Sequence, residues 1–125
     1  SSSESLPNSI PKLQSDGENW VIFDTRFSDA MNAKGCLGHL MGDVPEPKKP
    51  DDDADSAAQA AHCTALEKWT RNEASTRYFL SQRLPNTLLI STKGLTTVSS
   101  QWAYITRSMT SKSIHLQADQ RQKFL

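Results

Sequence analysis

Cysteine and histidine residues occur close together at two places in the sequence, and they are the first candidates for metal binding or catalysis. Cys36 and His39 have C-x-x-H spacing, and His62 and Cys63 would supply two further ligands. A structural zinc site needs four converging ligands, normally presented as two close pairs. Neighbouring residues on a helix point about 100° apart, so His62 and Cys63 would rarely chelate one ion together. We therefore predict no metal site, and expect a buried cysteine and a polar histidine instead.

Other chemical motifs are equally weak. Cys63 beside His62 could form a Cys–His pair, but no orienting acid or oxyanion-hole element accompanies it. The sequence contains no G-x-S-x-G element and neither glycine-rich phosphate loop. The run 51–53 (DDD) lacks the glycine and the closing glutamate of a calcium-binding loop, and is better explained as a solvated linker. These patterns predict a protein that is not an enzyme and binds no cofactor.

Charged residues are unevenly distributed along the 125-residue chain, although its net charge is zero. Residues 1–56 carry five Lys/Arg and eleven Asp/Glu, whereas residues 57–125 carry nine and three. Two copies could attract each other through these opposite charges, or the pattern could simply be an acidic loop beside an ordinary helical surface. Neither half is basic enough to predict tight nucleic-acid binding. The N-terminus does not resemble a signal peptide and no segment resembles a membrane span, so we expect a soluble, cytoplasmic protein without disulfides.

Apolar residues recur at helical spacing in several segments, and no segment shows the sustained alternation typical of a strand. A first helix is predicted from a capping box at Ser15 and Glu18 up to the helix-terminating Gly35. A short apolar turn at 36–41 follows it. Residues 43–56, rich in proline and aspartate, are predicted to be a surface linker.

A second, long helix is predicted to run from a capping box at Ser56 to Leu84, where Pro85 disfavours its continuation. Its apolar stripe is interrupted at Asn72 and Glu73, which indicates a break or a bend. An apolar turn is predicted at 88–90, followed by a helix at 98–109. A Thr/Ser-rich turn at 110–113 then leads into a last helical segment at 114–125.

These elements predict an all-α fold: a small bundle of about five helices over residues 15–125, preceded by an extended arm over residues 1–14. Because the last segment stops without a cap, we expect the chain to be part of a longer polypeptide. The three tryptophans could be stacking platforms for nucleic-acid bases, but each lies on the apolar stripe of its own helix, which favours the core. The predicted structural core is Trp20, Phe23, Phe27, Met31, Leu66, Trp69, Phe79, Leu80, Val98, Trp102 and Ile105.

Several short motifs follow one another along the chain. Residues 13–20 (LQSDGENW) contain a leucine and a G-x-N-[YW] element. Residues 33–42 (AKGCLGHLMG) resemble A-K-G-L-W-x-H-L-x-G, and residues 44–47 (VPEP) follow it. A tryptophan-containing helix, the turn after it and a T-A-x-x-[AL]-W element have matches at 66–74, 84–86 and 97–102. In this order, the motifs resemble those of the N-terminal Gag (capsid-type) domain of copia-type LTR retrotransposons.

The resemblance implies a structural role. Such domains are similar to the N-terminal domains of retroviral capsids, whose helical units self-associate into a particle around the element's RNA. Partners would be further copies of the chain and a downstream Gag domain, with RNA engaged indirectly or through segments outside this chain. A zinc knuckle and the polyprotein's enzymes would also lie outside it. The alternative is a Gag-like helical module retained by a host, which would bind a protein or peptide in a hydrophobic groove between the first two long helices.

Overall fold

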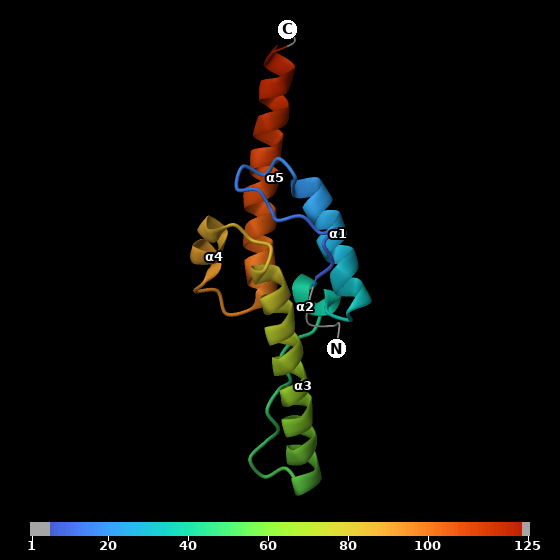
Figure 1. Cartoon of the computed structure of the whole chain (residues 1–125). Helices are drawn as coiled ribbons and strands as arrows, with labels where there is room; N and C mark the ends of the chain where they lie inside the picture. Colours follow the sequence, from blue (N-terminus) through green and yellow to red (C-terminus); the bar gives the residue numbers. More distant parts are fainter. Residues whose placement is uncertain (1–5, 124–125) are drawn as a thin grey trace.

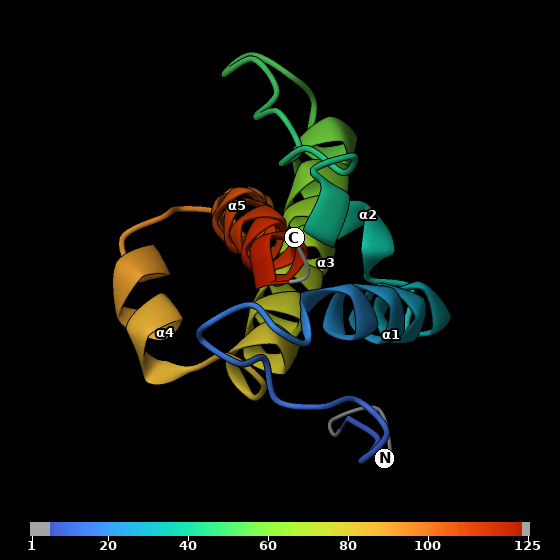
Figure 2. The ribbon, with the colours of Figure 1, turned by 90° about the horizontal axis from the view of Figure 1, so that it is seen from above.

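The computed structural model describes the backbone of residues 6–123 and the side chains of residues 6–114. This part of the chain forms five α-helices and no strand, so the predicted all-α fold is confirmed. The helices are α1 (Trp20–Ala33), α2 (Leu37–Met41), α3 (Ser56–Ser81), α4 (Asn86–Thr92) and α5 (Val98–Lys123). Short α2 packs against α1, α3 and α5, and thereby joins the three longer helices into one bundle. Viewed from above, α1 and α4 lie on opposite sides of α5 (Figure 2).

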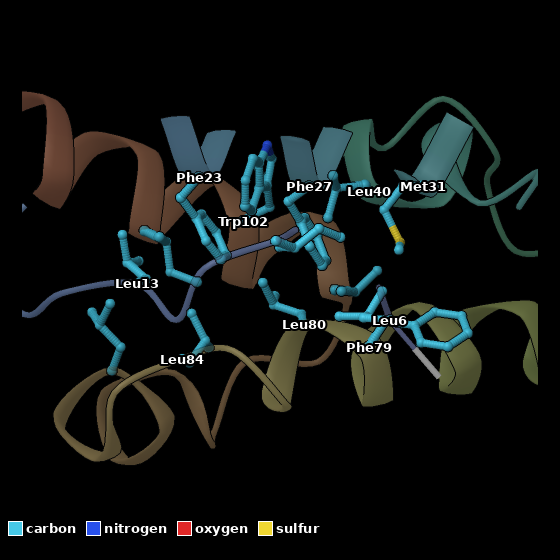
Figure 3. Packing of buried hydrophobic residues seen from close by; sticks show 14 of the residues in the cluster. Leu6, Leu13, Phe23, Phe27, Met31, Leu40, Phe79, Leu80, Leu84 and Trp102 are labelled. Atoms are coloured by element: carbon cyan, nitrogen blue, oxygen red, sulfur yellow. The ribbon is translucent and has the colours of Figure 1, made fainter. Parts of the chain in front are cut away.

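Aromatic side chains of α1 and α5 form the centre of the core (Figure 3). The Trp102 ring lies 5.4 Å from that of Trp20, 6.3 Å from that of Phe23 and 5.5 Å from that of Phe27, between centroids. Phe23 and Phe27 stack almost parallel on successive turns of α1, with an interplanar angle of 6°. These rings bury large apolar surfaces and add a favourable contribution from their tilted geometry.

Nine of the eleven residues predicted for the core are buried, but Leu66 and Trp69 are not. Leu66 is half-buried because the first part of α3 extends beyond the bundle (Figure 1), whereas Trp69 is half-buried at the edge of the bundle, where its ring packs on His39 of α2. The buried face of α3 is confined to its last turns, at Thr76, Phe79 and Leu80. Apolar spacing identified the correct face of the helix there, but it did not show where the neighbouring helices end.

The N-terminal arm supplies further core residues. Leu6, Ile10 and Leu13 are buried although residues 6–14 form no helix. Arg83, just after α3, holds the arm in place: its guanidinium donates to the carbonyl oxygens of Ile10 (3.1 Å) and Leu6 (3.4 Å). Its own carbonyl accepts a hydrogen bond of 2.8 Å from the Leu13 amide. The arm is thus fixed to the bundle by apolar burial and by backbone hydrogen bonds.

Both predicted capping boxes are wrong in detail. Helix α1 begins at Trp20, because the Asn19 side chain binds the arm, accepting from the Gln14 amide and donating to the Lys12 carbonyl at 2.9 Å each. Helix α3 is capped one residue earlier than predicted, by Asp55, whose carboxylate accepts from the Ala58 amide at 2.8 Å. The carboxylate also interacts favourably with the positive end of the helix.

Two expected interruptions are absent from the described helices. Helix α3 continues through residues 72–73, and α5 continues through 110–113, so the predicted Thr/Ser-rich turn is wrong. The stretch from Val98 to Lys123 contains neither proline nor glycine, and Ser and Thr are tolerated within a helix. As a result α3 and α5, each 26 residues long, project toward opposite ends of the molecule (Figure 1). No helix within residues 6–123 combines the length and apolarity that crossing a membrane requires.

Gly35 ends α1 in a left-handed conformation, with φ of 76°. The Cys36 amide then donates back to the Met31 carbonyl at 2.8 Å, and the Gly35 amide donates to that of Asn32 at 3.1 Å. These are the two bonds of a Schellman motif, which satisfies carbonyls at the helix end. The prediction that Gly35 caps this helix is therefore confirmed.

Replacing Gly35 with alanine tests this backbone constraint. A Cβ added at Gly35 would meet no atom within 4 Å, so the cost comes from the left-handed backbone alone. We expect G35A to lower the free energy of unfolding by about 1 kcal/mol in urea denaturation. The control is G94A, since Gly94 is equally unobstructed but lacks a positive φ. Equal stabilities for the two variants would contradict this explanation.

Candidate binding groove around Trp69

A groove of about 430 Å³ lies where the first residues of the linker pass between α2, α3 and the start of α5. We call it the Trp69 groove. The residues that define it come from all four segments: His39, Val44, Glu46, Trp69, Glu73 and Thr97. It is the only place in the described chain where a buried histidine, a carboxylate and a half-buried tryptophan lie together.

The wall formed by the linker is positioned by a glycine and by an indole. Gly38 lies under Val44, and a Cβ at that glycine would come within 2.7 Å of the valine Cγ2. A larger residue at this position would therefore require the Val44 side chain to shift. From the other side, Trp69 Nε1 donates a hydrogen bond of 2.8 Å to the Val44 carbonyl. Trp69 is thus a polar anchor for the linker, which the sequence analysis did not anticipate.

The floor of the groove pairs His39 with Glu73. The imidazole side chain is 4% exposed and the glutamate side chain 12% exposed, and Nδ1 lies 3.7 Å from Oε1. That separation is too long for a hydrogen bond, and Nδ1 has no hydrogen-bond partner among the described residues. The imidazole also packs on the Trp69 ring, with centroids 5.8 Å apart. The floor therefore holds two polar atoms that do not satisfy each other.

A second groove, of about 600 Å³, lies between the end of α1 and the middle of α3. Its lining includes Lys34, Arg71, Tyr78 and Phe79. The Lys34 ammonium lies 4.7 Å from the centre of the Phe79 ring, a cation–π contact. Arg71 and Tyr78 are exposed, so this groove presents a cationic and aromatic surface rather than a hydrophobic one.

The cysteines and histidines considered as ligands do not converge. Cys36 is buried beside α1, whereas Cys63 is exposed on the first half of α3, and both are free thiols. His62 and Cys63 line a shallow pocket with the acidic linker, far along α3 from the Trp69 groove. Among the described residues, no group of three or more His, Cys, Asp and Glu side chains could hold a metal ion. The expectation that Cys63 is buried is wrong, because it lies on the part of α3 that extends past the bundle.

Several cationic side chains donate hydrogen bonds to backbone carbonyls and thereby position the arm and the loops between helices. The guanidinium of Arg77 donates to the Leu95 carbonyl at 2.9 Å, and that of Arg26 to the Ser9 carbonyl at 2.6 Å. The ammonium of Lys112 donates to the Ser15 carbonyl at 2.7 Å, and Arg83 binds the arm. Three of the nine cations of residues 57–125, Arg77, Arg83 and Lys112, therefore keep their charge but are held in place by backbone carbonyls.

Glu73 and Val44 were missed as site residues, although a signal for Glu73 was present. The apolar stripe of α3 is interrupted at Asn72 and Glu73, and the helix is continuous there. Instead Glu73 faces His39 of α2. An interrupted stripe in an unbroken helix thus indicated a polar partner. The contact with Val44 could not be found this way, because it depends on how the linker folds back.

Comparison of the chain with protein-family models, curated proteins and solved structures finds no match.

Removing the indole N–H tests the anchoring role of Trp69. We expect Trp69→Phe to lower the free energy of unfolding by about 1 kcal/mol, because it loses one hydrogen bond to a backbone carbonyl. Hydrogen exchange of the Asp43 amide, which donates to the Gly38 carbonyl at 2.8 Å, should rise, and exchange in α1 should stay unchanged. The control is Tyr104→Phe, a hydroxyl deletion on an exposed side chain of α5. Unchanged exchange in the linker of the Trp69 variant would show that the hydrogen bond does not hold it.

Proposed function

We propose that this chain is a structural, non-enzymatic helical unit that self-associates, as the Gag capsid-type domain of a copia-type LTR retrotransposon would. In this proposal, copies of the chain build a particle in the cytoplasm that encloses the element's RNA. RNA is retained indirectly or through segments outside this chain, and a downstream Gag domain completes the assembly. The order of the motifs from residue 13 to residue 102 supports this identification.

The observation that carries the proposal is the projection of α3 beyond the bundle. Residues 56–70 are helical, yet none of them is buried. Isolated helices shorter than about 12–15 residues are marginal in water, and most helical stability in proteins comes from packing of one face. This one offers small side chains that allow close approach of another helix, and all of them are exposed: Ala57, Ala58, Ala60, Ala61 and Ala65. A helix from a second copy would stabilise it.

Three further features support association. Val21 and Ile22 on the outer side of α1 are 66% and 53% exposed, and Ile114 in the projecting part of α5 is 61% exposed. Asp51, Asp52 and Asp53, near the start of α3, are exposed as well. These acidic side chains would attract the basic residues 57–125 of a second copy. Attraction between opposite charges steers association and fixes its register more than it adds affinity.

The alternative function is a host-retained Gag-like module that binds another protein. A hydrophobic groove between the first two long helices is the feature expected for it, and the second groove described above, lined by Lys34, Arg71 and Phe79, occupies that position. Its lining is cationic and includes Phe79, a core residue, so it fits an acidic peptide better than an apolar one. The alternative therefore predicts a partner rich in Asp and Glu.

Light scattering on variants of the projecting helix tests self-association. We expect the mass of the unmodified chain to grow with concentration over a hundredfold range and to fall with added salt. Ala61→Glu should weaken the association about tenfold, because it places a bulky charge in a helix–helix contact. Ala61 is exposed in the monomer, so the free energy of unfolding should change little. The control is Ala103→Glu, at an exposed alanine of α5 within the bundle.

A monomer at every concentration would contradict self-association through this chain. Equal weakening by Ala61→Glu and Ala103→Glu would place the contact elsewhere than on the projecting part of α3.

A further inference from the structure

We propose that the Trp69 groove binds the cationic side chain of a lysine or arginine presented by a partner polypeptide. The proposal does not depend on self-association, because the groove is complete within one copy of the chain. It rests on the polar atoms of the floor, the charge of the lining and the character of the walls.

The floor offers a cation the Glu73 carboxylate and, in the imidazole tautomer protonated at Nε2, His39 Nδ1 as a second acceptor. Nδ1 of His39 lies 3.7 Å from Oε1 of Glu73 and has no hydrogen-bond partner among the described residues. A nitrogen donor placed about 2.8 Å from both atoms would bridge this gap, since charge-assisted hydrogen bonds are of that length. An ammonium or guanidinium group carries several N–H donors and can reach both acceptors at once.

The charge of the lining favours a cation. Glu73 and Glu46 both line the groove, and no lysine or arginine is among its lining residues. The Glu73 side chain is 12% exposed, and its carboxylate lies 3.7 Å from the His39 imidazole. A carboxylate removed this far from water is stabilised by a positive charge, so binding of a cation would offset its lost hydration.

The walls suit the aliphatic stem of a lysine or arginine. Val44 and Pro45 form one side of the groove and the Trp69 indole forms another. The stems of these side chains pack on apolar surface, and their charged ends interact favourably with the face of an indole. Because Trp69 is fixed by its hydrogen bond to Val44, the wall is formed before a ligand arrives.

A peptide titration monitored by NMR tests the proposal. The probes are the capped tripeptides Gly-Arg-Gly and Gly-Lys-Gly, with Gly-citrulline-Gly as the neutral counterpart of the arginine peptide. The Trp69 indole N–H signal reports on the groove, and the Trp20 and Trp102 signals report on the core. We expect both cationic peptides to shift the Trp69 signal with millimolar affinity, and the citrulline peptide to leave it unmoved.

Charge removal on α3 provides the matched test. Glu73→Gln keeps the shape of the side chain and should raise the Kd of the arginine peptide about tenfold. Glu67→Gln, at an exposed position on the same helix, should leave the Kd unchanged. Unmoved Trp20 and Trp102 signals would show that the fold survives the substitution. The proposal is overturned if no peptide shifts the Trp69 signal, if citrulline shifts it as much as arginine, or if Glu73→Gln binds arginine normally.

Discussion

The packing of one α5 side chain against α1 is the contact on which the rest of the molecule depends. Trp102 touches three aromatic rings of α1, and these rings come from positions that only a continuous helix can align. Helix α2 then fills the space beside this pair and brings α3 into contact with it. The arm closes the other side through its own buried residues. The other helices pack on α1 or α5, directly or through one intervening helix.

As a consequence, the burial of α3 decreases from its last turn to its first. Its last turns, around Phe79 and Leu80, are part of the core, whereas its middle contacts α2 and the linker through Trp69 and Glu73. None of the residues in its first turns is buried. The Trp69 groove lies at the transition between these zones, where polar residues replace apolar ones because burial is incomplete. Sites for partners are expected at such transitions, since polar groups there are positioned but not fully satisfied.

Sequence reasoning reached the fold class and nine buried core residues, because apolar spacing is a local property that survives into the folded state. It misplaced the start of α1, because the Asn19 side chain binds the arm instead of the helix end. It assigned Leu66 and Trp69 to the core, because the spacing of apolar residues does not show that α3 extends beyond the helices packed on it. Among the residues of the Trp69 groove, Glu73 could be found from the sequence, because it interrupts the apolar stripe of α3. Val44 and Gly38 could not, because their roles depend on how the linker folds back onto α2.

The opposite projections of α3 and α5 also determine how the molecule diffuses. Each 26-residue helix would be roughly 40 Å long, and the two are offset end to end rather than laid side by side (Figure 1). A monomer of this elongated form experiences more hydrodynamic drag than a sphere of the same 13.9 kDa mass. It should therefore elute early from a size-exclusion column and sediment slowly. An elution volume read against globular standards would overstate its mass and mimic a dimer.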